Sequence, residues 1–430
     1  RAAAGTPAPP APARREMQAV VSVGRDDGRL SPLTDEAPSS ALPLGNVPLL
    51  LHQVATLLQA GLEVLIVCPA EMEAHLLLLI AEQPGVELVP VEGYLGDAHA
   101  LRAVAHRIRG DVLVLGGDAL VGDVIPALAS LHRRNACDVT MLLRTEPPPE
   151  PPAPAAKSGG GKAKKPAAPS RHEWDVDIVG ISEDWRVVYK RPRAEVDDPV
   201  RLSKALLRRS GTMAVRTDLT DVQVYVFRHG VLALLEENHR LLSIRADLVP
   251  FLVDRQFQPL HVLQDPEHVP TLDPLRSPAG ADAALFGTED HLRCYALVVP
   301  HDGPYCRRMT TLSAYLAMDR DVLRLGLPSW VPLEGVQRRD QSVVSPACEV
   351  LPKASVRSSS VGDRCTIGGG SKLNGCIVMT DATVGQNCEL INVIVASGAT
   401  VGDGCKLTDC QVAPGASVDP STRAKGDVFA

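Results

Sequence analysis

The sequence predicts an α/β domain followed by a coil of short parallel β-strands. Two observations lead to this fold class. In the first half of the chain, short runs rich in β-branched residues alternate with helical stretches. In roughly the last ninety residues, an aliphatic residue returns at every sixth position, and the sixes are grouped into units of seventeen. At 430 residues the chain exceeds what one hydrophobic core usually serves, so we expect two or more domains.

The α/β pattern begins at Met17. We expect these elements in order: the strand Gln18–Val23, the helix Pro48–Gln59, the strand Glu63–Val67, the helix Glu71–Ala81, the strand Val86–Val91, the helix Ala98–Arg109 and the strand Asp111–Leu115. Strands separated by helical stretches indicate a parallel sheet that is covered by helices on both faces. Ligands of such sheets bind at the carboxyl ends of the strands.

Two Pro-rich segments interrupt the middle of the chain. Residues 145–170 combine prolines, three consecutive glycines and scattered lysines, so we expect a disordered insertion, a solvated linker rather than an electrostatic tether. Residues 258–280 carry five prolines and form a second loose segment. Around these segments we expect strands near Trp174–Val179, Arg186–Tyr189, Val222–Phe227 and Cys294–Val299, and helices at Ile244–Phe257 and Thr311–Leu323.

These patterns predict the domain organisation. We expect a disordered tail at 1–16, a first domain at 17–260, a linker at 261–290, a connector strand and helix at 291–340 and the coil at 341–430.

The period of seventeen runs through five units of the coil. The first aliphatic residue of each unit is a valine: Val344, Val361, Val378, Val395 and Val412. Two further aliphatic residues follow at plus six and plus twelve, as Ile367 and Leu373 do after Val361. Fixed-period self-similarity marks a solenoid, whose units bury their apolar faces only by stacking on their neighbours. Three aliphatic positions per unit, at steps of six, six and five, predict a three-sided coil.

A second register supports the coil. The residue four positions after most of the aliphatic ones is small, which places both side chains on the inner face of a short strand. Four of these small residues are Cys348, Cys365, Cys388 and Cys405. We interpret them as buried thiols, because the chain has no CxxC pair and no Cys/His cluster at zinc spacing. Four glycines directly follow aliphatic positions, where we expect corners that use positive φ: Gly362, Gly368, Gly385 and Gly402.

Composition narrows the function classes. A formal net charge of −7 provides no global basic field, which disfavours nucleic-acid binding as a main function. The Ala/Pro-rich start has no apolar core segment of a signal peptide, and the longest aliphatic run, Leu76–Ile80, is too short to span a membrane. Ten cysteines without a disulfide pattern favour a reducing compartment, so we expect the cytosol.

The stretch after the first strand lies where a phosphate-binding loop is expected. It reads Gly24-Arg25-Asp26-Asp27-Gly28-Arg29-Leu30-Ser31-Pro32-Leu33-Thr34, and Gly45-Asn46-Val47-Pro48-Leu49 follows. This resembles the signature of sugar-1-phosphate nucleotidyltransferases, in which a glycine-rich loop precedes Arg-Leu, Pro-Leu-Thr, Pro-Lys-Pro and Gly-Asn-x-Pro-Leu. The resemblance implies that Gly24 and Arg29 border a nucleotide pocket.

The loop departs from that signature where the chemistry needs it. A phosphate cradle needs backbone N–H groups that side chains do not obstruct, yet Arg25 and Asp27 stand where the family has glycine. The carboxylates of Asp26 and Asp27 would repel a triphosphate, and Ser39 takes the place of the family's lysine. Arg29 alone does not restore a transition-state clamp. We therefore expect no catalytic residue in this domain.

A second landmark of the family is an aspartate after a strand, which Leu113–Asp118 supplies. The resemblance implies that Gly117 and Asp118 border the same pocket, and that in active relatives this aspartate holds magnesium. Magnesium sites usually combine one or two carboxylates with substrate phosphates, and the phosphate half is damaged here. We expect no metal and no cofactor, and leave open a weak noncatalytic nucleotide or sugar-nucleotide site. The coil has no histidine after His301 to serve as a base, which disfavours acyl transfer.

Nucleotidyltransferase-like domains fused to a left-handed β-helix occur in mannose-1-phosphate guanylyltransferases, in bacterial glucose-1-phosphate enzymes and in two subunits of translation initiation factor 2B. Three stretches resemble the gamma subunits of that factor: Ser243–Val253, Arg293–Ala296 and Asp409–Val428. This resemblance implies the left hand of the coil. Epsilon subunits resemble the layout too, but continue into a helical exchange domain, whereas this sequence stops at Ala430.

The resemblance also implies a function. It indicates a noncatalytic gamma subunit of the guanine-nucleotide exchange factor that replaces GDP with GTP on initiation factor 2. The implied partners are the catalytic epsilon subunit, the alpha, beta and delta subunits, and initiation factor 2 as substrate protein, with no membrane and no sequence-specific nucleic acid. The alternative is an active mannose-1-phosphate guanylyltransferase. We further expect a partner or the C-terminal tail to cap the coil near Val412–Ser421.

Overall fold

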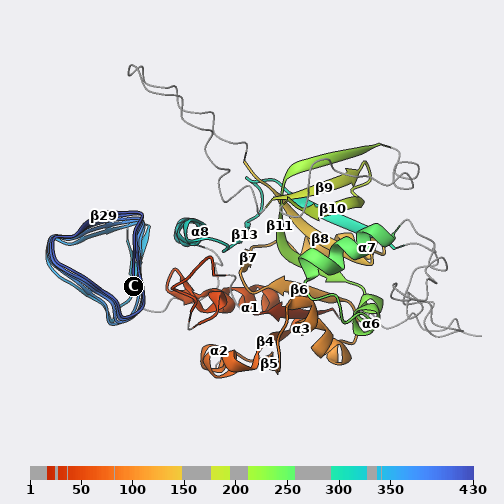
Figure 1. Cartoon of the computed structure of the whole chain (residues 1–430), viewed down its shortest axis with the longest axis horizontal. Coiled ribbons are helices and arrows are strands. Elements are labelled where there is room, and N and C mark those ends of the chain that lie inside the picture. Colours follow the sequence, from red (N-terminus) through yellow and green to blue (C-terminus); the bar gives the residue numbers. More distant parts are fainter. Residues whose placement is uncertain are drawn as a thin grey trace, which may run out of the picture.

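A computed structural model gives the structure of the chain and describes residues 17–24, 28–35, 37–81, 83–147, 176–193, 212–256, 292–326, 337–339 and 341–430. The predicted tail, nearly all of the predicted insertion and the whole predicted linker lie outside these residues, as does the start of the strand expected at Trp174. Figure 1 shows the two predicted parts, an α/β domain and a triangular coil, with helix α8 (Leu312–Leu325) between them.

A nine-stranded sheet forms the centre of the α/β domain, in the order β10-β9-β11-β6-β1-β4-β5, with β8 paired to β11 and β12. Four neighbouring strands are parallel, as predicted: β1 (Gln18–Ser22), β4 (Glu63–Pro69), β5 (Val86–Val91) and β6 (Val112–Gly116). Val20 pairs with both Leu65 and Val114, so the carboxyl ends of β1, β4 and β6 reach the same edge.

The other half of the sheet departs from the prediction of a parallel sheet. The long strand β11 (Met213–Phe227) runs antiparallel to β6, to β8 (Val139–Thr145) and to β9 (Val176–Ser182), which pairs antiparallel with β10 (Val187–Pro192). The sheet is therefore mixed. Strand direction depends on the connections between strands, and the apolar pattern within a strand does not encode it.

Helices cover both faces of the sheet, as predicted. On one face lie α3 (Asp97–Val104), α6 (His229–Glu237) and α7 (Val249–Arg255); on the other lie α1 (Leu49–Gln59), α2 (Glu73–Ile80) and α4 (Ile125–Arg134). Two predicted helices are less regular than expected. The helix expected over 98–109 ends at Val104 and continues as a 3₁₀ turn, and the one expected over 244–257 opens with a π turn before α7.

The strand expected in the connector belongs to the first domain. This strand, β12 (Cys294–Val299), pairs parallel with β8, so that Cys294 lies beside Val139. The sequence correctly predicts the strand, but its pairing partner lies more than a hundred residues upstream, where no local pattern reveals it. The short strand β13 (Cys306–Arg308) pairs antiparallel with β7 (Ala119–Val121).

The coil has three parallel sheets, one on each side of the triangle in Figure 1. Residues seventeen apart pair in register, as Val361 does with Val378 and Leu373 with Leu390. The first sheet contains β15 (Ser342–Val344), β18 (Ser360–Val361), β21 (Ile377–Val378), β24 (Ile394–Val395), β27 (Gln411–Val412) and β30 (Val428–Phe429), with β14 (Gln337–Arg339) antiparallel at its start.

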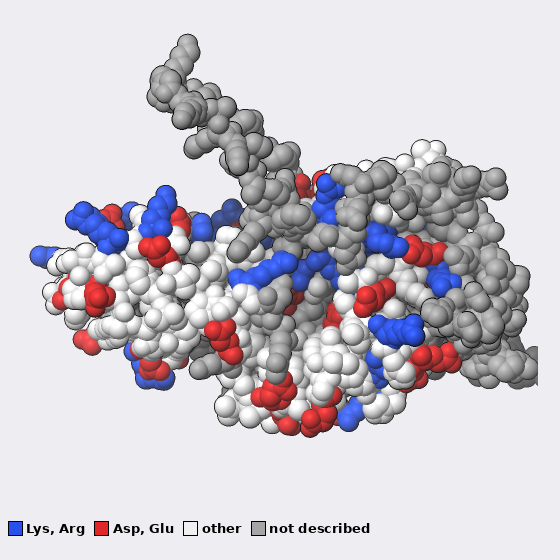
Figure 2. Space-filling model, in the orientation of Figure 1, with Lys and Arg blue, Asp and Glu red and all other residues white. Residues whose placement is uncertain are grey.

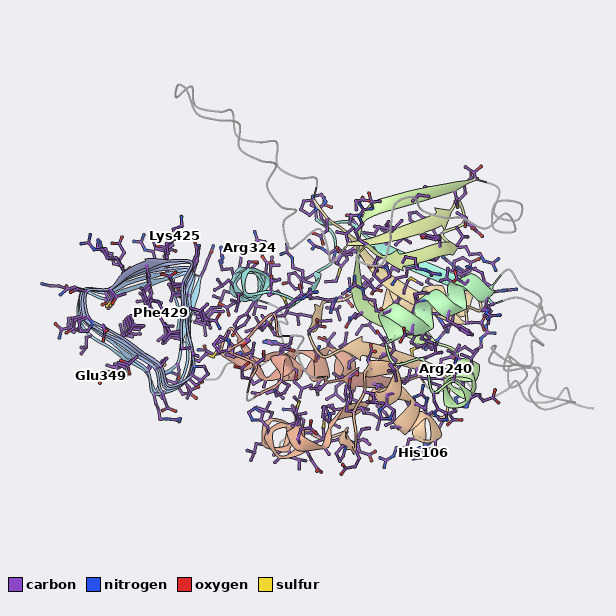
Figure 3. All side chains as sticks on the ribbon, viewed as in Figure 1. His106, Arg240, Arg324, Glu349, Lys425 and Phe429 are labelled. Atoms are coloured by element: carbon purple, nitrogen blue, oxygen red, sulfur yellow. The ribbon has the colours of Figure 1, made fainter. Side chains whose placement is uncertain are left out.

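The other two sheets follow the same period. The second contains β16 (Glu349–Val350), β19 (Thr366–Ile367), β22 (Thr383–Val384), β25 (Thr400–Val401) and β28 (Ser417–Val418). The third contains β17 (Ser355–Arg357), β20 (Lys372–Asn374), β23 (Glu389–Ile391), β26 (Lys406–Thr408) and β29 (Arg423–Lys425). The last residues of the chain cover β26 and β27 with β29 and β30. Phe429 packs against the core inside the triangle (Figure 3).

The cysteines of the coil lie inward, as predicted: Cys365, Cys388 and Cys405 are buried, Cys348 is partly buried, and all ten cysteines of the chain are free thiols. The expectation for the four glycines after aliphatic positions is wrong. None of them has positive φ; a Cβ on any of them would approach the backbone of the next turn to within 3.0 Å. Positive φ falls instead on three other series spaced by seventeen, which include Asn392 and Asp409.

Helix α8 joins the domain to the coil. Thr311 caps its start by accepting the Ala314 N–H, and Gly326 ends it with a φ of 64°. Its apolar face shares a core with Leu44 of the domain and Ile377 and Ile394 of the coil. Beside this core, the buried Asp319 carboxylate accepts the Gly45 N–H at 2.7 Å and the Ser360 hydroxyl at 2.9 Å. In the described part of the chain, no helix is long and apolar enough to cross a membrane.

Candidate functional site

A pocket of about 460 Å³ opens at the carboxyl ends of β1 and β6, where an α/β sheet binds its ligands. All four residues that the sequence assigns to a nucleotide pocket line it: Gly24, Arg29, Gly117 and Asp118. Ser39, which takes the place of the family's lysine, lines it as well. Arg25, Asp26 and Asp27 lie outside the described residues.

Glycine is required where β6 ends beside β1. The Gly117 N–H donates to the Ser22 carbonyl at 2.8 Å, and a Cβ on Gly117 would lie 2.9 Å from that oxygen. A Cβ on Gly116 would lie 2.6 Å from the Gln223 side-chain oxygen. The chain therefore turns tightly here and directs Asp118 into the pocket.

The Asp118 carboxylate is held by an arginine. Arg308 donates from Nη2 to Asp118 Oδ2 at 2.7 Å and from Nε to both carboxylate oxygens, at 3.1 and 3.3 Å. The backbone fixes this arrangement, because β13 pairs with β7 and the Met309 N–H donates to the Asp118 carbonyl at 2.8 Å. Although burial lowers the pKa of Arg308, Asp118 raises it further, so that the guanidinium stays charged.

This pair decides whether the site fits a magnesium ion. A carboxylate serves a metal through its free oxygen lone pairs. Two nitrogens of a guanidinium that is only 12% exposed donate to Oδ2 of Asp118, at 2.7 and 3.1 Å, and Oδ1 accepts a longer bond of 3.3 Å from Nε. Within the described residues, no group of three or more His, Cys, Asp or Glu side chains could hold a metal ion. The ion pair with Arg308 therefore neutralises the carboxylate that the resemblance assigns to a magnesium ion.

The wall contributed by α3 and the π turn carries a second carboxyl group. Asp97 accepts the Ile244 N–H at 2.8 Å and the Ala98 N–H at 3.0 Å. Burial raises its pKa to about 6. Nearby, the Tyr94 and Ser22 hydroxyls are 3.1 Å apart. Both backbone N–H groups donate to the same oxygen, Oδ1, so Asp97 joins two elements of the wall.

Behind the pocket lies a buried ionic network. Lys190 is fully buried and lies 3.0 Å from Asp177 and 2.9 Å from Asp221. Arg245, which lines the pocket, donates to Asp177 at 2.7 Å, and Tyr225 donates to Asp221 at 2.7 Å. Burial opposes the charged forms, yet Lys190 and Arg245 keep the pKa of Asp221 below its usual value. Two cations balance two carboxylates, so the network fixes Arg245 without charging the pocket.

Sequence reasoning identified one half of this pocket and missed the other. Asp97, Lys190 and Arg308 carry no motif signal, because the elements that hold them meet only in the folded sheet. Arg245 lies in the stretch Ser243–Val253, which resembles gamma subunits, but no motif assigns it to a site.

Comparisons with known proteins match both parts of the chain. A family model described as nucleotidyl transferase matches residues 19–152, and one described as GlmU-like, C-terminal hexapeptide matches residues 334–413. The translation initiation factor eIF2B subunit gamma of Schizosaccharomyces pombe is 29% identical, over 80% of this chain and 73% of its own. The eIF2B subunit gamma of Dictyostelium discoideum is 23% identical, over 80% of each chain. The chain is a homologue of the eIF2B gamma subunits.

A third relative matches a shorter part of the chain. The mannose-1-phosphate guanylyltransferase of Mycobacterium tuberculosis is 36% identical, over 30% of this chain and 38% of its own. The likeness to gamma subunits, in contrast, runs through the domain and the coil. The fold class predicted from the sequence, a nucleotidyltransferase-type domain followed by a left-handed β-helix of hexapeptide repeats, is confirmed.

Proposed function

We propose that this chain acts as the gamma subunit of an eIF2B complex, and that its nucleotidyltransferase-type domain is catalytically inactive. The role in translation initiation rests on the similarity to gamma subunits across both parts of the chain. The proposed inactivity rests on one observation, the ion pair of Arg308 with Asp118. A carboxylate that an arginine already neutralises does not recruit the cation that phosphoryl chemistry requires.

The rest of the pocket supports the same conclusion. Ser39 supplies a neutral hydroxyl where a transferase places a lysine, so the charge that would stabilise the transition state is absent from that position. We infer that Gly24, Arg29, Gly117 and Asp118 are the remnant of a nucleotide pocket. Their present role is to shape the edge of the sheet.

The proposed partners follow from this role. The chain pairs with the epsilon subunit, which carries out the exchange of GDP for GTP on initiation factor 2, and the pair joins the alpha, beta and delta subunits. We infer that it acts in the cytosol, where a reducing environment keeps all ten cysteines as thiols. In the complex, the coil and the α/β domain serve as a scaffold.

Capture of partners tests the role of the chain. The tagged chain is expressed in its own cells, and the proteins that copurify with it are identified by mass spectrometry. We expect the epsilon subunit and the other eIF2B subunits in amounts comparable to the chain. Recovery of the chain only as an assembly of its own copies would contradict the proposal.

The second candidate is an active mannose-1-phosphate guanylyltransferase, which the 36% identity to such an enzyme over 30% of this chain favours. It predicts magnesium-dependent release of pyrophosphate from GTP and mannose-1-phosphate. We expect no release above background from the purified chain. Release that disappears in Asp118→Ala would establish the enzyme and refute the inactive domain.

A further inference from the structure

A second hollow lies outside the pocket, at the junction of α8, β13 and the first turn of the coil. We call it the junction groove; its volume is about 330 Å³, and its lining includes Arg307, Arg320, Asp321, Arg324, Gln341 and Ser358. None of these residues lines the nucleotide pocket. Lys and Arg side chains gather over this region on the face shown in Figure 2.

The groove carries an excess of positive charge. Among the described residues that line the groove, Asp321 carries the single carboxylate, and it lies 3.3 Å from Arg324 and 3.6 Å from Arg307. Arg320 donates from Nε to the Leu316 carbonyl at 3.2 Å, which leaves its terminal nitrogens for a ligand. Three guanidinium groups therefore face one carboxylate, a net charge of two positive units.

The arginines are presented on a rigid frame. Arg320, Asp321 and Arg324 follow one another at helical spacing on one side of α8, and the opposite side of the helix is packed into the junction core. Arg324 is 62% and Arg307 36% exposed, so both remain within reach of a partner. Figure 3 shows Arg324 on α8, beside the coil.

We propose that the junction groove binds an acidic segment of a partner protein, through carboxylates that pair with Arg307, Arg320 and Arg324. Guanidinium groups recognise carboxylates by paired, charge-assisted hydrogen bonds. Three guanidiniums spread over two elements suit several carboxylates on one peptide better than a single small anion. Nucleic acid fits less well, because the lining contains no aromatic ring for base stacking and the chain has a net charge of −7.

Fluorescence anisotropy with the full chain tests this proposal, with a labelled oligoglutamate peptide as the probe. We expect the peptide to bind more weakly as salt is added. Arg320→Gln and Arg324→Gln should each lower the affinity about threefold, which corresponds to the loss of one exposed ion pair. Asp321→Asn removes the competing carboxylate and should raise the affinity about threefold. Arg364→Gln, which removes an exposed arginine of the coil, is the control and should change nothing.

The result that overturns the proposal is equally defined. Peptide affinity that stays unchanged in the Arg320→Gln/Arg324→Gln double variant places the binding elsewhere. A single-stranded RNA of equal charge that binds more tightly than the peptide and loses affinity in the same variant makes the groove a nucleic-acid site. Displacement of the peptide by inorganic phosphate at equal concentration makes it a site for small anions. The proposed function does not depend on any of these outcomes, because its role in translation initiation rests on the similarity to gamma subunits and its inactivity on the pocket at Asp118.

Discussion

Asp319 makes the junction between the domain and the coil sensitive to pH. The side chain is 1% exposed, and burial raises its pKa from the ordinary 3.8 to about 6, although the Gly45 N–H, the Ser360 hydroxyl and Arg320 lower it. A carboxyl with a higher pKa in the folded chain than in the unfolded one stabilises the fold when protonated. That stability is fully present below pH 3.8 and is lost as the pH rises through about 6.

The magnitude follows from the difference between the two pKa values. Protonation of Asp319 raises the free energy of unfolding by about 3 kcal/mol over the whole titration. About 1 kcal/mol of this stabilisation is gained as the pH falls from 7 to 5. The perturbation is Asp319→Asn, whose amide oxygen still accepts the Gly45 N–H but does not titrate. Asp97, whose pKa is also raised to about 6, titrates in both proteins and cancels in the comparison.

Urea unfolding followed by circular dichroism measures the effect at each pH. We expect the unfolding free energy of the wild type, relative to Asp319→Asn, to rise by about 1 kcal/mol from pH 7 to pH 5. Identical pH profiles for the two proteins would refute the assignment of this titration to Asp319. A fall in relative stability over the same interval would show that the sign of the reasoning is wrong.

Three further predictions concern the pocket, the network behind it and the coil. Arg308→Ala should lower the free energy of unfolding by about 2 kcal/mol and should free the Asp118 carboxylate. We therefore expect Mn²⁺ to raise the melting temperature of this variant, but not that of the wild type or of the neighbouring Arg307→Ala variant. Equal effects of Mn²⁺ on all three proteins would contradict the metal-excluding role of Arg308. Lys190→Met leaves the buried carboxylates of Asp177 and Asp221 with one cation, Arg245, in place of two, and should destabilise the domain by about 3 to 5 kcal/mol in urea unfolding, whereas the exposed Lys372→Met should have little effect. Gly368→Ala brings a methyl group against the backbone of the next turn and should destabilise the coil by about 3 kcal/mol. Gly415→Ala should destabilise it less, because the new methyl group meets no neighbouring atom and only the φ of 68° causes strain. The reverse order of the two variants in thermal unfolding would disprove the close-packing explanation.

The coil shows what a repeated pattern can predict. One strand residue in six and a period of seventeen are enough to predict three sheets, because every turn presents the same register to the next. The role of Gly368 was still misjudged. The sequence shows that this position needs glycine but does not show why, because glycine is needed both where φ is positive and where a neighbouring turn approaches closely.

The candidate site shows where prediction from sequence stops. The resemblance to nucleotidyltransferases assigns Gly24, Gly117 and Asp118 to one pocket, and the structure brings them together where the carboxyl ends of parallel strands meet at one edge. No motif assigns Arg308 to this pocket, although it forms the ion pair with Asp118. Its position depends on the antiparallel pairing of two three-residue strands that are almost two hundred residues apart, and no local pattern specifies such a pair.

The rate of nucleotide exchange on initiation factor 2 tests the central claim most directly. Release of labelled GDP from the factor is followed with the epsilon subunit alone, with this chain alone, and with both. We predict that the two together release GDP faster than the epsilon subunit alone, and that this chain alone leaves the spontaneous rate unchanged. A rate with both proteins equal to that with the epsilon subunit alone would contradict the account.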